Sequence, residues 1–255
     1  MKIVVCIKQV MVLPGAVVLD GEGTGIDPLF VTRRLNDPDR YAVEEAIRLC
    51  EEHGGGEVVV VSVGGAEADK ELRKCLAMGA QRAVRVADDG LQLFDPLVVA
   101  RALALVARRE AADLVLCGVQ SEDAAQQATG PALAGALAYP CVSMATKVEF
   151  EPDTRQLVVH KEASGGRTEV VQVDLPAVLT VQTGINTPRT ESFKAVMMAK
   201  RAQIEVTEPE DLPPSTIQVQ SMSAHAPSRG QLQLIEGDPA EVAARIRELV
   251  QEVSQ

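Results

Sequence analysis

Short, continuously apolar runs recur through the first 120 residues, and segments with helical periodicity separate them. The clearest run, Val58–Val61, stands between Gly54-Gly55-Gly56 and Gly64-Gly65. A strand that is apolar on both faces belongs in a parallel sheet with helices on both sides. The comparable runs are Ile3–Ile7, Ala83–Val86 and Leu114–Cys117. Their alternation with helical segments predicts an α/β fold, with an open, mostly parallel sheet, right-handed crossovers and helices on both faces.

The helical segments between these runs have recognisable starts. Asp37 can cap a helix that has Pro38 at its first position, and Asp95-Pro96 opens another helix that runs to about residue 109. The carboxylate pairs Glu44/Glu45 and Asp88/Asp89 are expected on exposed, solvated faces.

Other parts of the chain depart from this alternation. Two β-prone pieces at 16–19 and 30–32 predict a hairpin or an irregular excursion above the sheet. After Cys141, strands of antiparallel character are expected, which extend the sheet or cover one edge. They are predicted at 142–150, 156–162, 168–173 and 177–181.

The C-terminal part predicts a tail. Residues 207–230 are rich in Pro, Ser, Asp and Glu, which is typical of an extended linker, and Asp238-Pro239 opens an amphipathic helix. We therefore expect an α/β domain at 1–206 and a tail at 207–255.

Net charge excludes some classes of partner. A net charge of −11 argues against nucleic acid and against an anionic membrane surface. No apolar run reaches the roughly 18 residues that a membrane span needs. The N-terminus lacks the pattern of a signal peptide, so a cytoplasmic location is expected. The five cysteines form no C-x-x-C pair and the three histidines have no zinc spacing, so no metal site is expected.

The stretch between the fourth run and the next helix is the strongest candidate site. The strand at Leu114–Cys117 ends at Gly118, a polar loop follows, and Gly130-Pro131 opens an Ala/Gly-rich helix. Ligands of open parallel sheets bind beyond the carboxyl ends of the strands, and free N–H groups at a helix N-terminus hold phosphate without lysine. A phosphate site and a plain connection both remain open at this point.

No enzyme motif competes with that site. The chain lacks G-x-G-x-x-G after its first strand, a Walker A loop, G-x-S-x-G and H-E-x-x-H. Phe193 stands among polar residues, and two interpretations remain open: it packs in a local core, or it is an exposed anchor for a partner.

Several segments together resemble the beta (small) subunit of an electron transfer flavoprotein over nearly the whole chain. Each segment is weak alone, but their order and spacing are specific. They are Val4–Val10, Asn36–Ala46, Leu76–Ala80, the loop with Gly118, Gln120, Asp123, Thr129 and Gly130, and Asn186–Arg189 followed by Met197–Lys200.

The resemblance implies a heterodimer with an alpha subunit, with FAD held mainly by that subunit and AMP bound structurally by this chain. It implies that acyl-CoA or related dehydrogenases donate electrons and that a membrane quinone oxidoreductase or another acceptor receives them. The tail helix would pack on the alpha subunit, without insertion into a membrane. The implied nucleotide-binding residues are Cys6, Asn36, Asp37, Pro38, Asp39, Val63, Gly118, Val119, Gln120, Ser121, Glu122, Asp123, Ala124, Ala125, Gln126, Gln127, Ala128, Thr129 and Gly130.

The resemblance also implies a partner-recognition loop, in which Phe193 stands where the family usually has an exposed leucine. The loop consists of Thr190, Glu191, Ser192, Phe193, Lys194, Ala195, Val196, Met197 and Met198.

This chain departs from the family in its nucleotide loop. Ala124-Ala125 stand where the family often has further acidic residues, so main-chain N–H groups are expected to hold the phosphate. Gly130-Pro131 is reminiscent of electron-bifurcating members, which bind a second FAD in place of AMP, whereas Ala128-Thr129 is closer to the AMP type. Two alternatives stay open: a bifurcating subunit with its own FAD and an NADH site, and a stand-alone adenine-nucleotide-binding regulatory domain.

Overall fold

A computed structural model describes residues 1–87, 94–209, 212, 214–215, 217–224 and 234–253. The chain divides into two compact units, 1–222 and 223–255. Asp88 and Asp89 lie outside the described residues, so their expected exposure stays a prediction.

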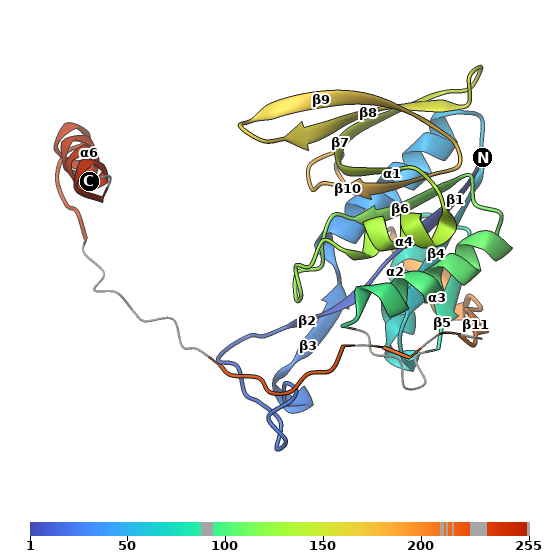
Figure 1. The fold of residues 1–255 in the computed structure, drawn as a ribbon, viewed down its shortest axis with the longest axis horizontal. Helices are drawn as coiled ribbons and strands as arrows, with labels where there is room; N and C mark the ends of the chain where they lie inside the picture. Colours follow the sequence, from blue (N-terminus) through green and yellow to red (C-terminus); the bar gives the residue numbers. More distant parts are fainter. Residues whose placement is uncertain (88–93, 210–211, 213, 216, 225–233, 254–255) are drawn as a thin grey trace. The chain divides into compact units, whose positions relative to one another are not determined.

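Nine strands of the described chain form one open sheet in the first unit (Figure 1). The order across the sheet is β11-β5-β4-β1-β6-β10-β7-β8-β9, and all pairs are parallel except β7–β8 and β8–β9. The mostly parallel sheet and its antiparallel extension are therefore confirmed. The strands are β1 (Lys2–Cys6), β4 (Glu57–Val63), β5 (Arg82–Val86), β6 (Leu114–Gly118), β7 (Cys141–Glu151), β8 (Gln156–Ala163), β9 (Arg167–Asp174), β10 (Ala177–Val181) and β11 (Glu205–Thr207).

Helices cover both faces of the parallel part of the sheet. Ile3 and Val5 of β1 point into a core formed with α1 and α2, whereas Val4 and Cys6 point into a second core formed with α3 and α4. This division follows from the period of two along a strand, and it explains why β1 is apolar from Ile3 to Cys6. The helices of this unit are α1 (Asp37–Glu52), α2 (Asp69–Met78), α3 (Pro96–Arg109), α4 (Thr129–Leu137) and α5 (Phe193–Arg201), and the short 3-10 helices are η1 (Pro28–Phe30) and η2 (Ala66–Ala68).

Three local expectations were wrong. The excursion is a hairpin, as one of the two alternatives predicted, but its strands are β2 (Gln9–Val12) and β3 (Thr32–Leu35), which form a separate two-stranded sheet, and not the pieces at 16–19 and 30–32. The predicted strand at 177–181 is β10, which is parallel to both neighbours because the chain returns to insert it between β6 and β7. Asn36, rather than Asp37, occupies the N-cap position of α1.

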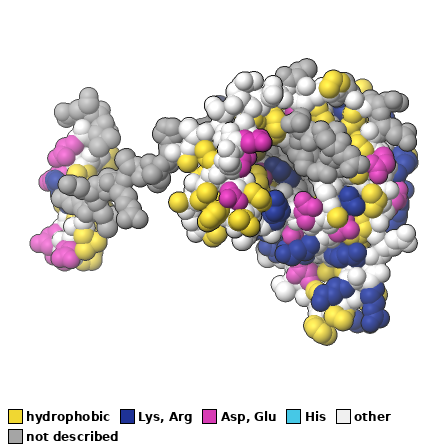
Figure 2. Space-filling model, turned by 90° about the horizontal axis from the view of Figure 1, so that it is seen from below, with side chains coloured by type: hydrophobic (Ala, Val, Ile, Leu, Met, Phe, Trp, Pro, Cys, Tyr) yellow, Lys and Arg dark blue, Asp and Glu magenta, His cyan; other side chains and the backbone are white. Residues whose placement is uncertain are grey.

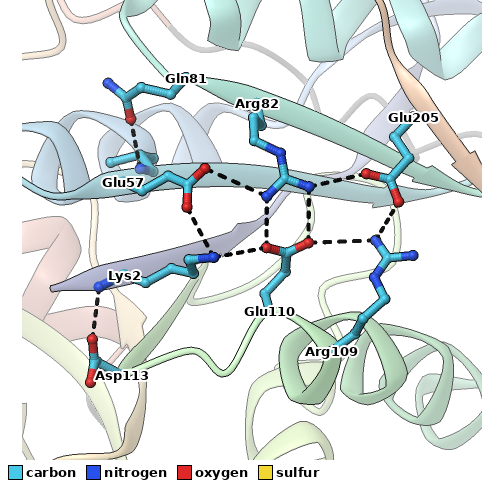
Figure 3. A network of polar contacts seen from close by, with 9 residues as sticks. Lys2, Glu57, Gln81, Arg82, Arg109, Glu110, Asp113 and Glu205 are labelled. Carbon is cyan, nitrogen blue, oxygen red and sulfur yellow. Dashed lines mark hydrogen bonds and ion pairs between the residues drawn. The ribbon is translucent and has the colours of Figure 1, made fainter.

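Sequence analysis also missed β11, which extends the sheet beyond β5. Glu205 in this strand pairs with Arg82 at 3.1 Å and with Arg109 at 2.7 Å (Figure 3). Arg82 and Lys2 also pair with Glu110, whose side chain is buried. Charged side chains from β1, β5, α3 and β11 thus form one network at the amino edge of the sheet.

The second unit contains α6 (Pro239–Val253), in agreement with the predicted tail helix. Asp238 Oδ1 accepts hydrogen bonds from Ala240 N and Glu241 N, and Asp238 N donates to Glu241 Oε2, as in a capping box. None of the described helices combines the length and the apolar character of a membrane-spanning helix.

Candidate functional site

Asp39 joins three segments at the carboxyl edge of the sheet. Its Oδ2 accepts a hydrogen bond from Lys8 N at 2.7 Å, and its Oδ1 accepts one from Gly118 N at 3.0 Å. Burial raises the pKa of Asp39 to about 7, although hydrogen bonds from Asn36, Lys8 and Gly118 act in the opposite direction. The buried carboxyl therefore fixes the end of β1, the start of α1 and the end of β6 in one arrangement.

Close packing leaves no room for a side chain at Gly118. A Cβ there would lie 2.4 Å from Asp39 Oδ1 and 2.7 Å from Pro38 Cβ. Gly130 is equally confined, because a Cβ would lie 2.3 Å from Thr180 Cγ2. Both glycines bounding the loop thus allow close approach, of α1 to β6 and of α4 to β10.

Asn36 fixes the start of that loop. Its Nδ2 donates to Gln120 O at 2.9 Å, and its Oδ1 accepts from Glu122 N at 3.1 Å. The buried side-chain amide of Asn36 makes no capping hydrogen bond to α1. It connects the start of the helix to the loop instead, and the sequence alone could not distinguish this role from that of a helix cap.

Two acidic side chains of the loop face other parts of the chain. Glu122 pairs with Arg34 at 2.7 Å and accepts from Asp37 N at 3.2 Å. Asp123 pairs with Lys8 Nζ at 2.6 Å. Burial acts to raise the pKa of Asp123, but the hydrogen bond and charge of Lys8 outweigh it, so that pKa is lowered. Both carboxylates therefore hold the loop against β3 and the β1–β2 connection.

The main chain of the loop ends in a strained turn at the N-terminus of α4. Ala125 and Gln127 have positive φ angles of 50° and 54°, which non-glycine residues seldom adopt. Ala128 is right-handed, and no side chain caps the helix at this position. When successive residues alternate between left-handed and right-handed backbone conformations, their N–H groups point toward a common centre and form an anion-binding concavity. Free N–H groups at the first turn of α4 strengthen that property.

Most of the predicted nucleotide-binding residues lie together. Cys6 is paired in register with Cys117 of β6, and Val63 ends β4, one strand further along the same edge. Figure 2 views the molecule from the side of the β2–β3 hairpin, where basic side chains lie beside acidic ones. The predicted segments 36–39 and 118–130 are in direct contact through the hydrogen bonds above. Lys8 and Arg34 also contact the loop, but sequence analysis did not assign them to the site.

The predicted recognition segment is only partly a loop. Thr190, Glu191 and Ser192 precede α5, and residues 193–198 form its first turns. Ser192 Oγ caps the helix by accepting from Ala195 N at 3.2 Å. Phe193 is 82% exposed, which excludes a place in the local core of this chain. The predicted nucleotide-binding segments contain none of these residues, so the two candidate sites are built from different parts of the chain.

A pair of glutamates was assigned wrongly. Glu44 and Glu45 are 4% and 5% exposed, although solvated faces were expected. They are buried because the segment before α5 lies over α1 and donates hydrogen bonds to both. The signal in the sequence was the spacing of Glu44 and Glu51, which places two carboxylates on one helix face two turns apart.

A cavity of about 580 Å³ lies outside both candidate sites. It is bounded by α2, β5 and the segment that leads into β11. Its lining includes Leu76, Arg82 and Glu205, and none of its lining residues was predicted to bind a ligand.

Comparison with known proteins assigns the chain to a family. The electron transfer flavoprotein domain matches residues 30–212. The chain is 38% identical to electron transfer flavoprotein subunit beta of Methylophilus methylotrophus, over 99% of this chain and 98% of that protein. It is 37% identical to the human subunit beta over 83% of each chain, and 33% identical to the Bacillus subtilis subunit beta over 85% of each. The chain therefore belongs to the electron transfer flavoprotein family, as a relative of its beta subunits.

Proposed function

We propose that this chain is the beta subunit of a heterodimer that carries electrons from acyl-CoA or related dehydrogenases to a membrane quinone oxidoreductase or another acceptor. The observation that carries the proposal is the exposed apolar side of α5, where Phe193 is 82% and Met197 38% exposed. Large apolar side chains on the surface of a strongly acidic chain are typical of a docking surface. The relatives named subunit beta support an alpha subunit as the permanent partner.

In this proposal the chain performs no acid–base or nucleophilic step. FAD, held mainly by the alpha subunit, supplies the electron-carrying chemistry when bound. The chain provides the docking surface and part of the subunit interface. We propose that α6 belongs to that interface, because its apolar residues Ile246 and Val250 are 49% and 60% exposed.

The ligand that we propose for this chain itself is AMP, at the loop between β6 and α4. The uncapped N-terminus of α4 and the left-handed Ala125 and Gln127 support a phosphate site built from main-chain N–H groups. The ion pairs of Glu122 with Arg34 and of Asp123 with Lys8 support it further, because these carboxylates do not present free negative charge to a phosphate.

Cofactor analysis of the purified heterodimer tests both parts of the proposal. We expect one FAD and one AMP per heterodimer after denaturation and chromatography. Two FAD molecules and no AMP would favour the bifurcating alternative. A chain that keeps a nucleotide but forms no flavin-containing heterodimer would favour the stand-alone regulatory domain.

Electron transfer is tested by mixing the heterodimer with an acyl-CoA dehydrogenase and its acyl-CoA substrate. We expect the absorbance of the heterodimer's flavin to bleach at a rate that depends on dehydrogenase concentration. A flavin that stays oxidised would contradict the proposal that acyl-CoA dehydrogenases donate electrons to this heterodimer.

A further inference from the structure

The segment before α5 is anchored on α1 by one guanidinium group. Arg189 Nε lies 2.9 Å from Glu44 Oε2, and its Nη2 lies 3.1 Å from Glu44 Oε1. The same group reaches Glu51 through Nη1 at 2.8 Å and Nη2 at 2.9 Å. Two carboxylates thus hold one planar fork, an arrangement that a lysine cannot reproduce.

Main-chain and amide contacts complete this anchor. Arg189 N donates to Glu44 Oε2 at 3.0 Å, and Asn186 Nδ2 donates to Glu45 Oε2 at 2.8 Å and to Tyr41 O at 3.0 Å. The Glu44 side chain is 5% exposed and the Glu51 side chain 59%. The anchor therefore has a buried half, formed with Glu44, and an exposed half, formed with Glu51.

A second arginine holds the opposite end of α5. Arg73 of α2 donates from Nη1 to Ala199 O at 2.9 Å and to Ala202 O at 2.6 Å. Ala199 O, in the last turn, also accepts from Ala202 N at 3.2 Å, and Ala202 O lies just beyond the helix. Arg73 therefore adds a side-chain donor to the C-terminal end of α5, where helix carbonyl groups lack a full set of intrahelical partners.

The helix between the two arginines is short and largely exposed. It has nine residues, of which only Ala199 is buried. A helix of this length is not stable in isolation, so its shape depends on tertiary contacts. Phe193 and Met197 lie four residues apart on one side, and their relative position is fixed only while the helix is formed.

We propose that Arg189 and Arg73 are positioning residues that hold α5 in its docking conformation before a dehydrogenase binds. The proposal rests on the proposed function of α5 as the docking surface. Ordering a segment during association weakens binding, and a segment ordered beforehand avoids that loss. Release of either end of α5 therefore raises the KM for the heterodimer as electron acceptor and leaves kcat unchanged.

The test uses the full heterodimer with Arg73→Met, Arg189→Lys and Glu51→Gln. Glu51→Gln removes only the exposed half of the Arg189 anchor, so it stays informative if Arg189→Lys fails to fold. Arg155→Met is the matched control, because Arg155 also pairs with a carboxylate, Asp113 at 2.7 Å, but its described side chain has no hydrogen bond to the anchored segment or to α1. Flavin absorbance confirms that each heterodimer is intact.

Two measurements are made on each variant. Hydrogen–deuterium exchange of peptides that cover 190–202 is expected to be about tenfold or more faster in the three variants and unchanged in Arg155→Met. The KM for the heterodimer with an acyl-CoA dehydrogenase is expected to rise about tenfold for Arg73→Met and Arg189→Lys, and less for Glu51→Gln, without a change in kcat.

The outcomes separate this proposal from the docking function. Unchanged exchange in all folded variants overturns the positioning role. Faster exchange with an unchanged KM also overturns it, while a raised KM in Phe193→Ala would leave the docking function in place. If Phe193→Ala itself leaves the KM unchanged, the docking function fails, and positioning for docking fails with it.

Discussion

Gly118 and Asp39 are 79 residues apart in the sequence, yet the N–H of Gly118 donates to Asp39 Oδ1 at 3.0 Å. The contact exists because Gly118 has no side chain and because Asp39 lies in the first turn of α1, which packs against β6. It links the start of the nucleotide loop to the N-terminus of α1, so its loss should affect both stability and nucleotide binding.

Gly118→Ala should lower the free energy of unfolding of the heterodimer by about 1–3 kcal/mol, because the new Cβ overlaps a packed carboxyl and backbone. Gly135→Ala is the control, since a Cβ there meets nothing within 4 Å. The control should be neutral or stabilising by up to about 1 kcal/mol. Urea denaturation at fixed protein concentration measures the unfolding free energy of both variants. Equal changes in the two variants would show that close packing at Gly118 does not limit stability.

Asp39 should make stability depend on pH. Its folded pKa is raised to about 7 from 3.8, so the folded state binds this proton more tightly than the unfolded chain does. Its contribution to stability is therefore full below about pH 4 and decreases as pH rises to about 7. The unfolding free energy of wild type minus that of Asp39→Asn should fall across this window. A constant difference would show that Asp39 does not titrate there.

Lys8→Met should loosen the nucleotide loop, because Asp123 would lose its ion-pair partner while remaining mostly buried. We expect a loss of about 1 kcal/mol in unfolding free energy and a lower ratio of AMP to FAD. Lys147→Met is the control, since Lys147 pairs with Glu149 on an exposed strand face. An unchanged ratio of AMP to FAD in Lys8→Met would show that this ion pair does not contribute to nucleotide retention.

Phe193→Ala should slow electron transfer from the dehydrogenase and leave the flavin content of the heterodimer intact, because the side chain is 82% exposed. Removal of a central apolar anchor costs about 1–2 kcal/mol of binding, so the KM should rise about tenfold. Leu29→Ala removes a similarly exposed apolar side chain from a different part of the chain and should have no effect. Stopped-flow measurement of flavin reduction compares the two variants.

Glu110→Gln should affect stability alone. The pKa of Glu110 is lowered by its hydrogen bond to Arg82, so its stabilising charge is present above about pH 4.5 and is lost as pH falls. The variant should lose about 1 kcal/mol at pH 7 and keep its AMP content and transfer rate, because the network lies at the amino edge of the sheet. A changed AMP content would mean that the two edges are coupled.

The core of the fold could be predicted because its signal is local. The valine run of β4 and the apolar run of β6 each show a strand buried on both faces, without reference to any partner. The loop between β6 and α4 could be located for the same reason, since it follows such a strand and precedes a helix, and its role as a nucleotide site stays a prediction.

The missed features depend on contacts between distant segments. The three-residue strand β11 is held by Glu205 with Arg82 and Arg109, and no local pattern shows this pairing. Glu44 is charged and lies beside other acidic residues, so only the presence of Arg189 above it explains its burial. The ion pairing of Glu122 and Asp123 similarly depends on Arg34 and Lys8, which are distant in the sequence.

The position of β10 has a consequence for the newly made chain. This strand lies between β6 and β7, but it is synthesised after β7, β8 and β9. Until the ribosome has released residue 181, β6 ends the parallel sheet with unpaired N–H and C=O groups on one side. The sheet is therefore completed late in translation, and the interval before β10 arrives is the period in which the nascent chain is most exposed to aggregation.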